Sequence, residues 1–349
     1  MPQTDIRSML PEEIETAILE MGEQKFRAKQ IFQWLHRGAR NFDEMTNLSA
    51  ALREKLTARF TLHAPELMEK QESTDGTIKY LWQLSDGNSI ETVLMRYRHG
   101  NTICISTQVG CRMGCTFCAS TIGGLVRNLT AAEMIEEVLF TEQDSGLKIS
   151  NIVLMGIGEP LDNFEQVLRF LELVNHPDGL HIGMRHITLS TCGLVEEIDK
   201  LATYNLQLTV SISLHAPDDE TRSRLMPVNR GSGVRELLAA AERYVNSTGR
   251  RVTFEYAMVH GVNDTPDHAR ALAKLIKHVH SHVNLIPLNP IVERELGPSV
   301  KENLDTFEHI LRRAGVNVTI RRSLGGDIDA SCGQLRRRKE SEAKEEGRV

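Results

Sequence analysis

The 349-residue sequence lacks the features of a membrane, secreted or strongly basic protein. It contains no run of about 18 uncharged apolar residues, the length that a membrane-spanning helix needs. Residues 1–15 carry acidic side chains and no apolar stretch, so we expect no secretory signal and a cytoplasmic location. Positive charge is not in excess, because 41 Lys and Arg against 47 Asp and Glu give a formal net charge of −6. Net charge alone therefore does not indicate nucleic-acid binding.

Aromatic residues and cysteines are also scarce. Aromatics make up 5% of the chain, which argues against an extended surface on which nucleic-acid bases stack. Only six cysteines occur, and three of them fall between Cys111 and Cys118. A disulfide-stabilised secreted domain would distribute its cysteines more widely. Clustered thiols in a reducing compartment indicate metal binding, and the 40% apolar content is that of a folded globular protein.

Residues 1–70 are predicted to form a small helical domain. Apolar spacing predicts helices over residues 11–21, 26–37 and 49–60. Residues 71–100 follow as a β-hairpin connector, in which the runs TIKYLWQL and SIETVLMRY flank the turn Ser85-Asp86-Gly87-Asn88. Residues 1–70 are thus expected to be helical, and residues 71–100 are expected to be strand-rich.

Basic side chains gather in two places despite the negative net charge. The first group falls in one N-terminal helical stretch and consists of Lys25, Arg27, Lys29, Arg37 and Arg40. The second group flanks the last cysteine and consists of Arg321, Arg322, Arg336, Arg337, Arg338 and Lys339. Such groups are either ordinary solvated faces or contacts for phosphates. The sequence alone leaves both interpretations open.

From residue 101 onward, strand-like and helix-like segments alternate. About six such βα units predict an α/β fold with a parallel sheet, which we assign to residues 101–335. A partial (β/α)6 TIM-like barrel is favoured over an open doubly wound sheet, although sequence separates the two poorly. In either fold the catalytic groups lie at the C-terminal ends of the strands. The charged residues 336–349 are predicted to be a disordered tail.

The central motif is Cys111-Arg-Met-Gly-Cys115-Thr-Phe-Cys118, directly after the first barrel strand. Three thiolates so close together on one loop can bind a single inorganic centre. A structural zinc site normally has four ligands, usually in two separated pairs. A [4Fe–4S] cluster usually has four cysteines as well, so three would leave one iron open to another ligand. The spacing favours the cluster, with zinc as the alternative.

This C-x3-C-x2-C run, with Phe117 before the third cysteine, resembles that of the radical SAM superfamily. The segment Gly156-Ile157-Gly158-Glu159-Pro160 adds to the likeness, because the superfamily has a Gly-rich turn ending in Glu-Pro after its second strand. The resemblance implies that S-adenosylmethionine (SAM) chelates the open iron of a [4Fe–4S] cluster. An electron from the cluster then cleaves SAM and produces a 5′-deoxyadenosyl radical.

Within the superfamily, almost the whole chain resembles the RlmN/Cfr group of rRNA adenine methyltransferases. The matching parts include the helical N-terminal domain, the segment CISTQVGC and the late segment GDIDASCGQL, which contain the isolated Cys104 and Cys332. The resemblance implies that Cys332 takes a methyl group from one SAM and that a second SAM activates it. An adduct with the RNA follows, and attack by Cys104 on the sulfur of Cys332 releases it with formation of a disulfide. Without the family motif, both cysteines would be read as small buried hydrophobes.

Further site residues are implied by the same resemblance. Glu91 matches the family's proton acceptor, although a polar strand residue is its ordinary interpretation. The positions matching SAM contacts are Gly158, Glu159, Ser190, Ser213, Leu214, His215 and Asn289. For His215, a hydrogen bond at the edge of the cofactor is favoured over acid–base catalysis or iron ligation. Cys192 replaces the more usual Ser of its turn and is expected to be a bystander.

The resemblance also implies the substrate. Pro160 is typical of the RlmN type, which methylates C2 of an adenine in 23S rRNA, whereas Cfr-type sequences tend to have Ala there and methylate C8. The RlmN type further implies a tRNA substrate, an adenine near the anticodon, and an electron donor such as flavodoxin or ferredoxin. Adenine C2 is electron-poor and cannot attack the methyl group of SAM, so a detour through Cys332 and two SAM molecules per turnover is chemically reasonable.

Two other functions remain as alternatives. Another radical SAM enzyme, such as a glycyl-radical activase or a small-molecule mutase, would need the cluster and Gly158-Glu159 but would not use Cys104 and Cys332. A noncatalytic RNA-binding protein with a structural metal site would use the basic residues without cleaving SAM.

Overall fold

The structure is a computed structural model that describes residues 3–289, 291, 294–328 and 333–345. Its strands are β1 (Thr4–Asp5), β2 (Phe60–Thr61), β3 (Glu66–Glu72), β4 (Ile78–Gln83), β5 (Ser89–Tyr97), β6 (Gly100–Cys104), β7 (Gln108–Gly110), β8 (Leu125–Asn128), β9 (Ile149–Leu154), β10 (Ile187–Thr191), β11 (Thr209–Ser213), β12 (Val252–Met258), β13 (Ser281–Pro287) and β14 (Val318–Ile320). Its α-helices are α1 (Pro11–Glu20), α2 (Phe26–Leu35), α3 (Ala50–Arg59), α4 (Ala131–Ser145), α5 (Phe164–Asn175), α6 (Val195–Thr203), α7 (Asp219–Leu225), α8 (Val234–Thr248), α9 (Pro266–Leu275), α10 (Lys301–Arg313) and α11 (Gln334–Glu345). Short 3-10 turns are η1 (Ile6–Ser8), η2 (Phe42–Glu44), η3 (Ala119–Thr121), η4 (Pro160–Asn163), η5 (Met184–His186) and η6 (Pro227–Arg230).

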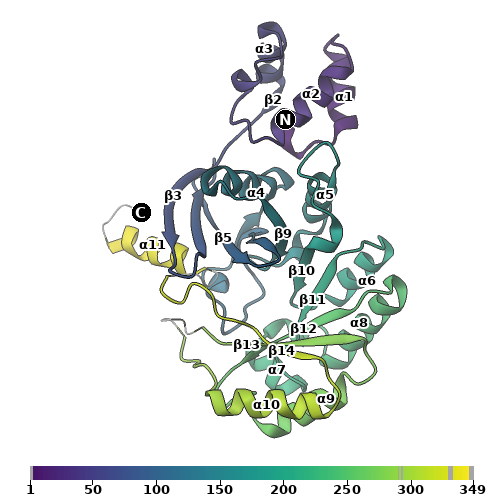
Figure 1. The fold of residues 1–349 in the computed structure, drawn as a ribbon, viewed down its shortest axis with the longest axis vertical. Coiled ribbons are helices and arrows are strands. Elements are labelled where there is room, and N and C mark those ends of the chain that lie inside the picture. Colours follow the sequence, from purple (N-terminus) through teal and green to yellow (C-terminus); the bar gives the residue numbers. More distant parts are fainter. Residues whose placement is uncertain (1–2, 290, 292–293, 329–332, 346–349) are drawn as a thin grey trace.

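One ten-stranded sheet dominates the molecule, in the order β14-β13-β12-β11-β10-β9-β6-β5-β4-β3. Strands β6 and β9–β14 are parallel, and each lies beside the strand that precedes it in this series. A doubly wound sheet would reverse its strand order at a switch point, and this series does not. The partial barrel predicted from the alternating segments is therefore confirmed, with helices α4–α10 interspersed among its strands (Figure 1).

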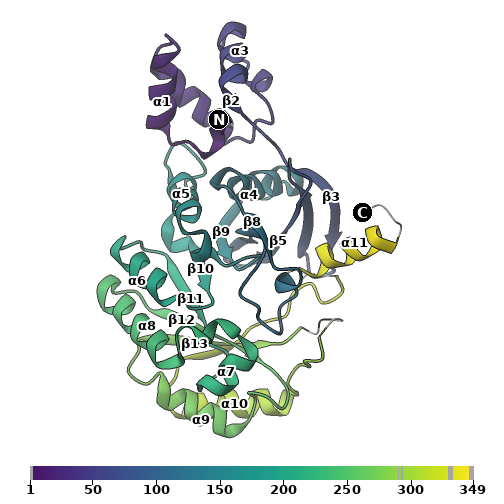
Figure 2. The same cartoon turned by 180° about the vertical axis from the view of Figure 1, so that it is seen from behind.

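The N-terminal residues form a separate helical unit at one end of the molecule, remote from α9 and α10 (Figures 1 and 2). Helices α1, α2 and α3 lie where the apolar spacing predicted them, and they bury Ile14, Ile31, Phe32 and Leu52 between them. A short parallel pair, β1 with β2, closes the unit and was not expected from the sequence.

The connector is larger than the predicted hairpin. Strands β3, β4 and β5 form an antiparallel ribbon, continued by β6. Strand β3 begins at Glu66, inside the segment that we expected to be helical, and its sequence ELMEKQE has little apolar character. It forms because it pairs with β4 along the edge of the sheet, a tertiary contact that local sequence does not reveal.

The predicted disorder of residues 336–349 is wrong for the part that the structure describes. Residues Gln334–Glu345 form α11, which lies beside the antiparallel ribbon (Figure 1). Leu335 is fully buried, and Arg338 and Lys339 pair with Glu69 of β3. The charged side chains that suggested disorder thus form ion pairs with an acidic residue of β3. Residues 346–349 lie outside the described part.

Every helix in the described ranges is too short or too polar to cross a membrane.

Candidate active site

A small hairpin holds the loop that carries the three clustered cysteines. Strands β7 and β8 pair antiparallel at its base, and the amide of Cys111 donates to the carbonyl of Gly124 at 3.0 Å. At the other end, the hydroxyl of Thr121 donates to the carbonyls of Cys115 and Cys118, at 3.1 and 2.9 Å. These hydrogen bonds therefore give the loop a defined shape.

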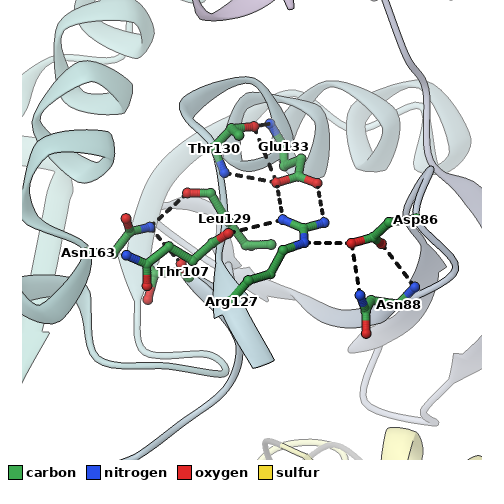
Figure 3. A network of polar contacts seen from close by, with 9 residues as sticks. Asp86, Asn88, Thr107, Arg127, Leu129, Thr130, Glu133 and Asn163 are labelled. Carbon is green, nitrogen blue, oxygen red and sulfur yellow. Dashed lines mark hydrogen bonds and ion pairs between the residues drawn. The ribbon is translucent and has the colours of Figure 1, made fainter. Parts of the chain in front are cut away.

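A network centred on Arg127 fixes this hairpin to its neighbours (Figure 3). Arg127 of β8 donates to Asp86 in the turn after β4 at 2.6 Å, and to both oxygens of Glu133 in the first turn of α4 at 2.7 and 2.9 Å. Glu133 in turn forms a capping box with Thr130, which fixes the start of this helix. The cysteine loop is thus tied to both the antiparallel ribbon and α4.

The three thiols face one pocket but do not converge on one point. Cys111 and Cys115 are buried, Cys118 is partly exposed, and all three line the same cavity. Among the described residues, no three Cys, His, Asp or Glu side chains stand close enough to hold a single metal ion. A [4Fe–4S] cluster binds each cysteine through a different iron, so spread thiols fit a cluster better than a zinc ion.

Burial affects the chemistry of these thiols. Desolvation raises the pKa of Cys111 to about 12 and that of Cys115 well above its usual value. The apolar lining, which includes Met113 and Met226, therefore keeps these thiols protonated until a metal centre displaces the protons.

The expected SAM-binding residues lie around this cavity at the carboxyl ends of successive barrel strands. Gly158 follows β9, Ser190 lies near the end of β10, Ser213 ends β11, and Glu159 and His215 follow β9 and β11. All five line the pocket that contains the cysteines. Leu214 does not, because its side chain is fully buried in the main core. Asn289 lines two adjoining pockets instead.

The glycine turn after β9 lies against the loop after β6. A Cβ on Gly158 would be 2.6 Å from the Cβ of Gln108, and the φ of Gly158 is +110°. A Cβ on Gly156 would be 2.5 Å from the carbonyl oxygen of Ile105. No side chain fits at either position, so the backbone of this turn stays close to the cavity.

The carboxylate of Glu159 organises the turn. Its two oxygens accept the amides of Leu161 at 3.1 Å and Cys192 at 2.7 Å, which links the ends of β9 and β10. Burial raises the pKa of Glu159, and these backbone hydrogen bonds oppose the rise. In the ionised form the carboxylate keeps spare lone pairs for a cationic ligand.

His215 is held as a neutral hydrogen-bond donor. Its Nδ1 accepts the amide of Ala257 at 2.9 Å, which leaves the proton on Nε2. Burial, with a contribution from the nearby Arg222, lowers the pKa of His215 to about 3. The ring packs edge-on against Phe117, with centroids 4.9 Å apart. This arrangement suits a hydrogen bond to a ligand and does not suit a charged acid.

A second pocket adjoins the first. Cys104, at the end of β6, lines it together with Val93, Met95, Tyr97 and Asn289. Met155, Ile286 and Arg321 line both pockets and form their shared wall. Cys104 therefore lines a pocket that shares a wall with the cysteine-lined cavity.

Glu91 and the C-terminal segment meet beside these pockets. Glu91 is buried in β5, forms an ion pair with Lys79 at 2.9 Å, and accepts the amides of Gly333 and Arg336. Cys332 lies outside the described residues. Its neighbour Gly333 packs against Ser120 of η3, the turn that directly follows Cys118.

Two residues of the site were not recognised from the sequence in their structural roles. Arg222 of α7 is buried and donates to the carbonyls of Leu214, Ser213 and Cys192 at 2.6–3.1 Å, joining the ends of β10 and β11. Cys192, expected to be a bystander, lines the cavity, and its amide orients Glu159. No sequence pattern signals a buried arginine that pairs with carbonyls.

Comparisons with known proteins agree along the chain. Residues 105–276 match the model of the radical SAM superfamily, and residues 4–62 match that of the ribosomal RNA large subunit methyltransferase N-terminal domain. The chain is 51% identical to a "Probable dual-specificity RNA methyltransferase RlmN" of Desulforamulus reducens, over 97% of both chains. A relative with the same description from Bacillus thuringiensis is also 51% identical, over 97% of this chain and 95% of the relative.

A solved structure shows the same fold. The radical SAM methyltransferase from Sphaerobacter thermophilus is 44% identical, and the two align with a TM-score of 0.91 over 95% of this chain and 98% of the other. The protein is thus an enzyme that uses a [4Fe–4S] cluster and SAM and acts on RNA, not a noncatalytic binding module. The chain belongs to the RlmN family of radical SAM RNA methyltransferases.

Proposed function

We propose that this enzyme methylates C2 of one adenine in the peptidyl-transferase region of 23S rRNA, and an adenine in the anticodon loop of some tRNAs. The observation that carries the proposal is the pair of adjoining pockets. One contains the three cysteines and the Gly158-Glu159 turn, and the other contains Cys104. Met155 and Arg321 stand between them, so a base in the second pocket would lie next to SAM in the first.

Each residue has a distinct task in this proposal. Cys111, Cys115 and Cys118 hold the cluster, which supplies the electron for the cleavage of SAM. Glu159 binds the ammonium of the methionine part, and the Nε2 proton of His215 donates to the cofactor. Ser190, Ser213 and Asn289 supply polar contacts. Leu214 is excluded as a side-chain contact by its burial and contributes only backbone.

Methyl transfer proceeds through Cys332. Its thiolate displaces S-adenosylhomocysteine from one SAM and becomes S-methylcysteine. When a second SAM is cleaved to methionine, the S-methyl group loses one hydrogen atom to the 5′-deoxyadenosyl fragment. The resulting carbon radical adds to adenine C2 and gives a covalent protein–RNA adduct.

Cys104 and Glu91 resolve that adduct. The ring proton at C2 leaves to a base, the role assigned to Glu91, and the unpaired electron of the adduct would return to the oxidised cluster. The thiolate of Cys104 then attacks the sulfur of Cys332 and a disulfide forms, which cellular thiols reduce. The carbon–sulfur bond breaks with its electron pair on carbon, and this carbon takes up a proton to become the methyl group. Flavodoxin or ferredoxin is the class of electron donor proposed for the cluster.

Basic residues on the helical unit are proposed to contact RNA phosphates. Lys25, Lys29, Arg37 and Arg40 are exposed, although Lys25 pairs with Glu15 and Lys29 with Asp178. Such contacts strengthen binding in a manner that salt weakens. The target adenine must leave its stack to enter the pocket of Cys104.

Two cysteine variants test the proposal. Cys332→Ala is expected to keep the cluster and lose RNA methylation, because no thiol remains to carry the methyl group. Cys104→Ala is expected to accumulate a covalent protein–RNA species, seen as a shifted band on a denaturing gel. Mass spectrometry of 23S rRNA fragments from cells with and without the protein identifies the product. Methylation by Cys332→Ala, or a C8-methylated adenine, would overturn the proposal.

A further inference from the structure

We propose that the antiparallel ribbon β3–β5 is a two-sided clamp that positions the C-terminal segment carrying Cys332. Lys79 and Glu91 hold the segment on one side, at Gly333 and Arg336. The turn after β3, residues 73–75, holds it on the other side, at residues 325–327. The inference rests on the proposed role of Cys332 as the methyl carrier and assigns Lys79, Glu91 and Asp327 as positioning residues for it.

The first side of the clamp is the start of α11. The first turn of a helix has amides without partners inside the helix. Glu91 supplies those partners, because its Oε2 accepts the amide of Gly333 at 2.5 Å and its Oε1 accepts the amide of Arg336 at 2.7 Å. A carboxylate at a helix N-terminus is also favoured by the helix dipole. The carboxylate therefore fixes where the helix begins.

Lys79 holds this carboxylate in place. Its Nζ lies 2.9 Å from Oε2 of Glu91, and the two side chains are 0% and 2% exposed. The two residues lie diagonally across the adjacent strands β4 and β5, where Lys79 pairs with Val93 and Glu91 with Leu81. A buried carboxylate that lost this cation would be strongly destabilised. The ion pair thus makes Glu91 a rigid anchor rather than a mobile side chain.

The second side of the clamp is the turn between β3 and β4. Asp327 accepts the hydroxyl of Ser73 at 2.5 Å and the amide of Thr74 at 3.0 Å. Asp75 accepts the amide of Gly325 at 2.8 Å, and this backbone hydrogen bond is the main reason that its pKa falls to about 2. Two carboxylates, one from each partner, therefore bind the segment to the ribbon on the other side of residues 328–332.

The clamp sets the position of the segment relative to the cysteine loop. Gly333 has a φ of +81°, and a Cβ there would lie 2.8 Å from the amide nitrogen of Ser120. Ser120 belongs to η3, whose N-cap is Cys118. The peptide bond joins Cys332 to Gly333, so fixing Gly333 keeps the methyl-carrying residue within reach of the cluster ligands.

Both anchors restrict the segment between them. Five residues, 328–332, connect Asp327 to Gly333, and an extended chain covers at most about 3.5 Å per residue. Cys332 must meet SAM, the adenine and Cys104 in turn. Three donors reach the carboxylate of Glu91, whose two oxygens offer about four lone-pair sites, so one site stays available for the proton that Glu91 is proposed to accept.

The test measures how fast Cys332 acquires a methyl group. Reconstituted holoenzyme, freed of its methyl group by one turnover with RNA, is mixed with SAM and followed by intact-protein and peptide mass spectrometry. Lys79→Met and Asp327→Ala are expected to lower the maximal rate about tenfold, the effect of losing one hydrogen bond to a charged group. The KM for SAM and the cluster absorption spectrum should not change, and amides of residues 333–345 should exchange hydrogen faster.

Matched controls separate the clamp from a general loss of structure. Lys70→Met removes a similar lysine from the neighbouring strand β3, where Lys70 pairs with Glu72 and with Asp144 of α4. It is expected to load methyl at the wild-type rate. Lys79→Arg keeps the charge and should restore loading. If Lys79→Met does not fold, the loading rate of Asp327→Ala tests the clamp instead. Asp327 is exposed, so its substitution is expected to leave the fold intact.

The outcomes are distinct. Wild-type loading in both Lys79→Met and Asp327→Ala, a raised KM at constant maximal rate, or an equal loss in Lys70→Met would overturn the clamp. A wild-type enzyme that never methylates Cys332 would instead overturn the proposed function.

Discussion

At the scale of single residues, the shape of the site depends on residues whose backbone contacts fix their conformation or their protonation. Gly158 brings the backbone to the cavity, Glu159 links two strand ends, and His215 keeps its proton on Nε2. Each of these properties comes from a backbone contact. Even a substitution that adds or removes a single methyl group at these positions should therefore weaken SAM binding.

Gly158→Ala tests the role of close backbone approach. The new Cβ would overlap Gln108 and would also require a positive φ, so we expect SAM binding to fall at least tenfold and stability to drop by several kcal/mol. Gly146→Ala is the control, because Gly146 has a φ of +67° but nothing within 4 Å of a Cβ, and should cost about 1 kcal/mol. Equilibrium dialysis measures SAM binding and urea unfolding measures stability, for both variants. Equal effects of the two substitutions would contradict the steric argument.

The individual residues show what sequence reasoning could and could not supply. Spacing and family likeness led to Cys111, Cys115, Cys118 and Glu159, which the structure brings to one cavity. Leu214 was carried over from a motif, and its place in the core shows that a motif does not specify which way a side chain points. Arg222 contacts carbonyls from three different residues, and only the folded chain brings those together.

At the scale of elements, the helical unit is joined to the barrel by a buried ion pair. Arg7 of η1 lies 2.5 Å from Glu136 of α4, and the two side chains are 0% and 3% exposed. Arg7 also donates to the carbonyls of His63 and Ala39, both in the helical unit. This one side chain therefore connects three segments of the unit to the barrel.

Glu136→Ala tests this connection. It leaves the guanidinium of Arg7 buried without its counter-charge, so we expect a loss of about 3–5 kcal/mol in the free energy of unfolding. RNA methylation should fall, whereas SAM cleavage without RNA should persist. Glu15→Ala breaks the exposed pair with Lys25 and should cost less than about 1 kcal/mol. An equally small effect of both variants in urea unfolding would show that the buried pair does not anchor the unit.

His36, in the helical unit, makes the stability of the protein depend on pH. It follows α2 and packs against Phe32 and His176, and burial is the main cause that lowers its pKa to about 3. In the unfolded chain the imidazole of His36 binds a proton below about pH 6.5, whereas in the folded protein it does so only near pH 3. The free energy of unfolding is therefore highest above pH 6.5 and falls toward pH 3, by up to about 1.4 kcal/mol per pH unit. His36→Leu should reduce this slope, and His278→Leu, at an exposed position, should not. Unfolding midpoints between pH 7 and 4 measure it, and an unchanged slope in His36→Leu would contradict this account.

The elements that sequence predicted well are those whose signal is local. Helices α1–α3 follow from apolar spacing. Strand β3 and helix α11 were missed because each exists through contact with a distant segment. β3 needs β4, and α11 needs Glu91 and Glu69. Strongly charged segments of this kind are predicted as loops or tails unless their partners are known.

At the scale of the whole molecule, the barrel brings two pockets to a shared wall, and the ribbon carries the C-terminal segment to the same place. The SAM pocket is lined from residues that follow β7, β9, β10 and β11, whereas the pocket of Cys104 is lined from β5, β6 and the segment after β14. The proposed reaction, which moves one carbon from SAM through Cys332 to a base, requires this adjacency.

The most direct test is isotopic. The holoenzyme, with no methyl group on Cys332 at the start, is given SAM with a fully deuterated methyl group, a reductant and a 23S rRNA fragment. The adenosine product and the 5′-deoxyadenosine are then analysed by mass spectrometry. Transfer through a methylene radical on Cys332 predicts C2-methyladenosine with two deuteriums and 5′-deoxyadenosine with one. A product methyl group that keeps all three deuteriums would mean direct transfer from SAM and would contradict the role of Cys332.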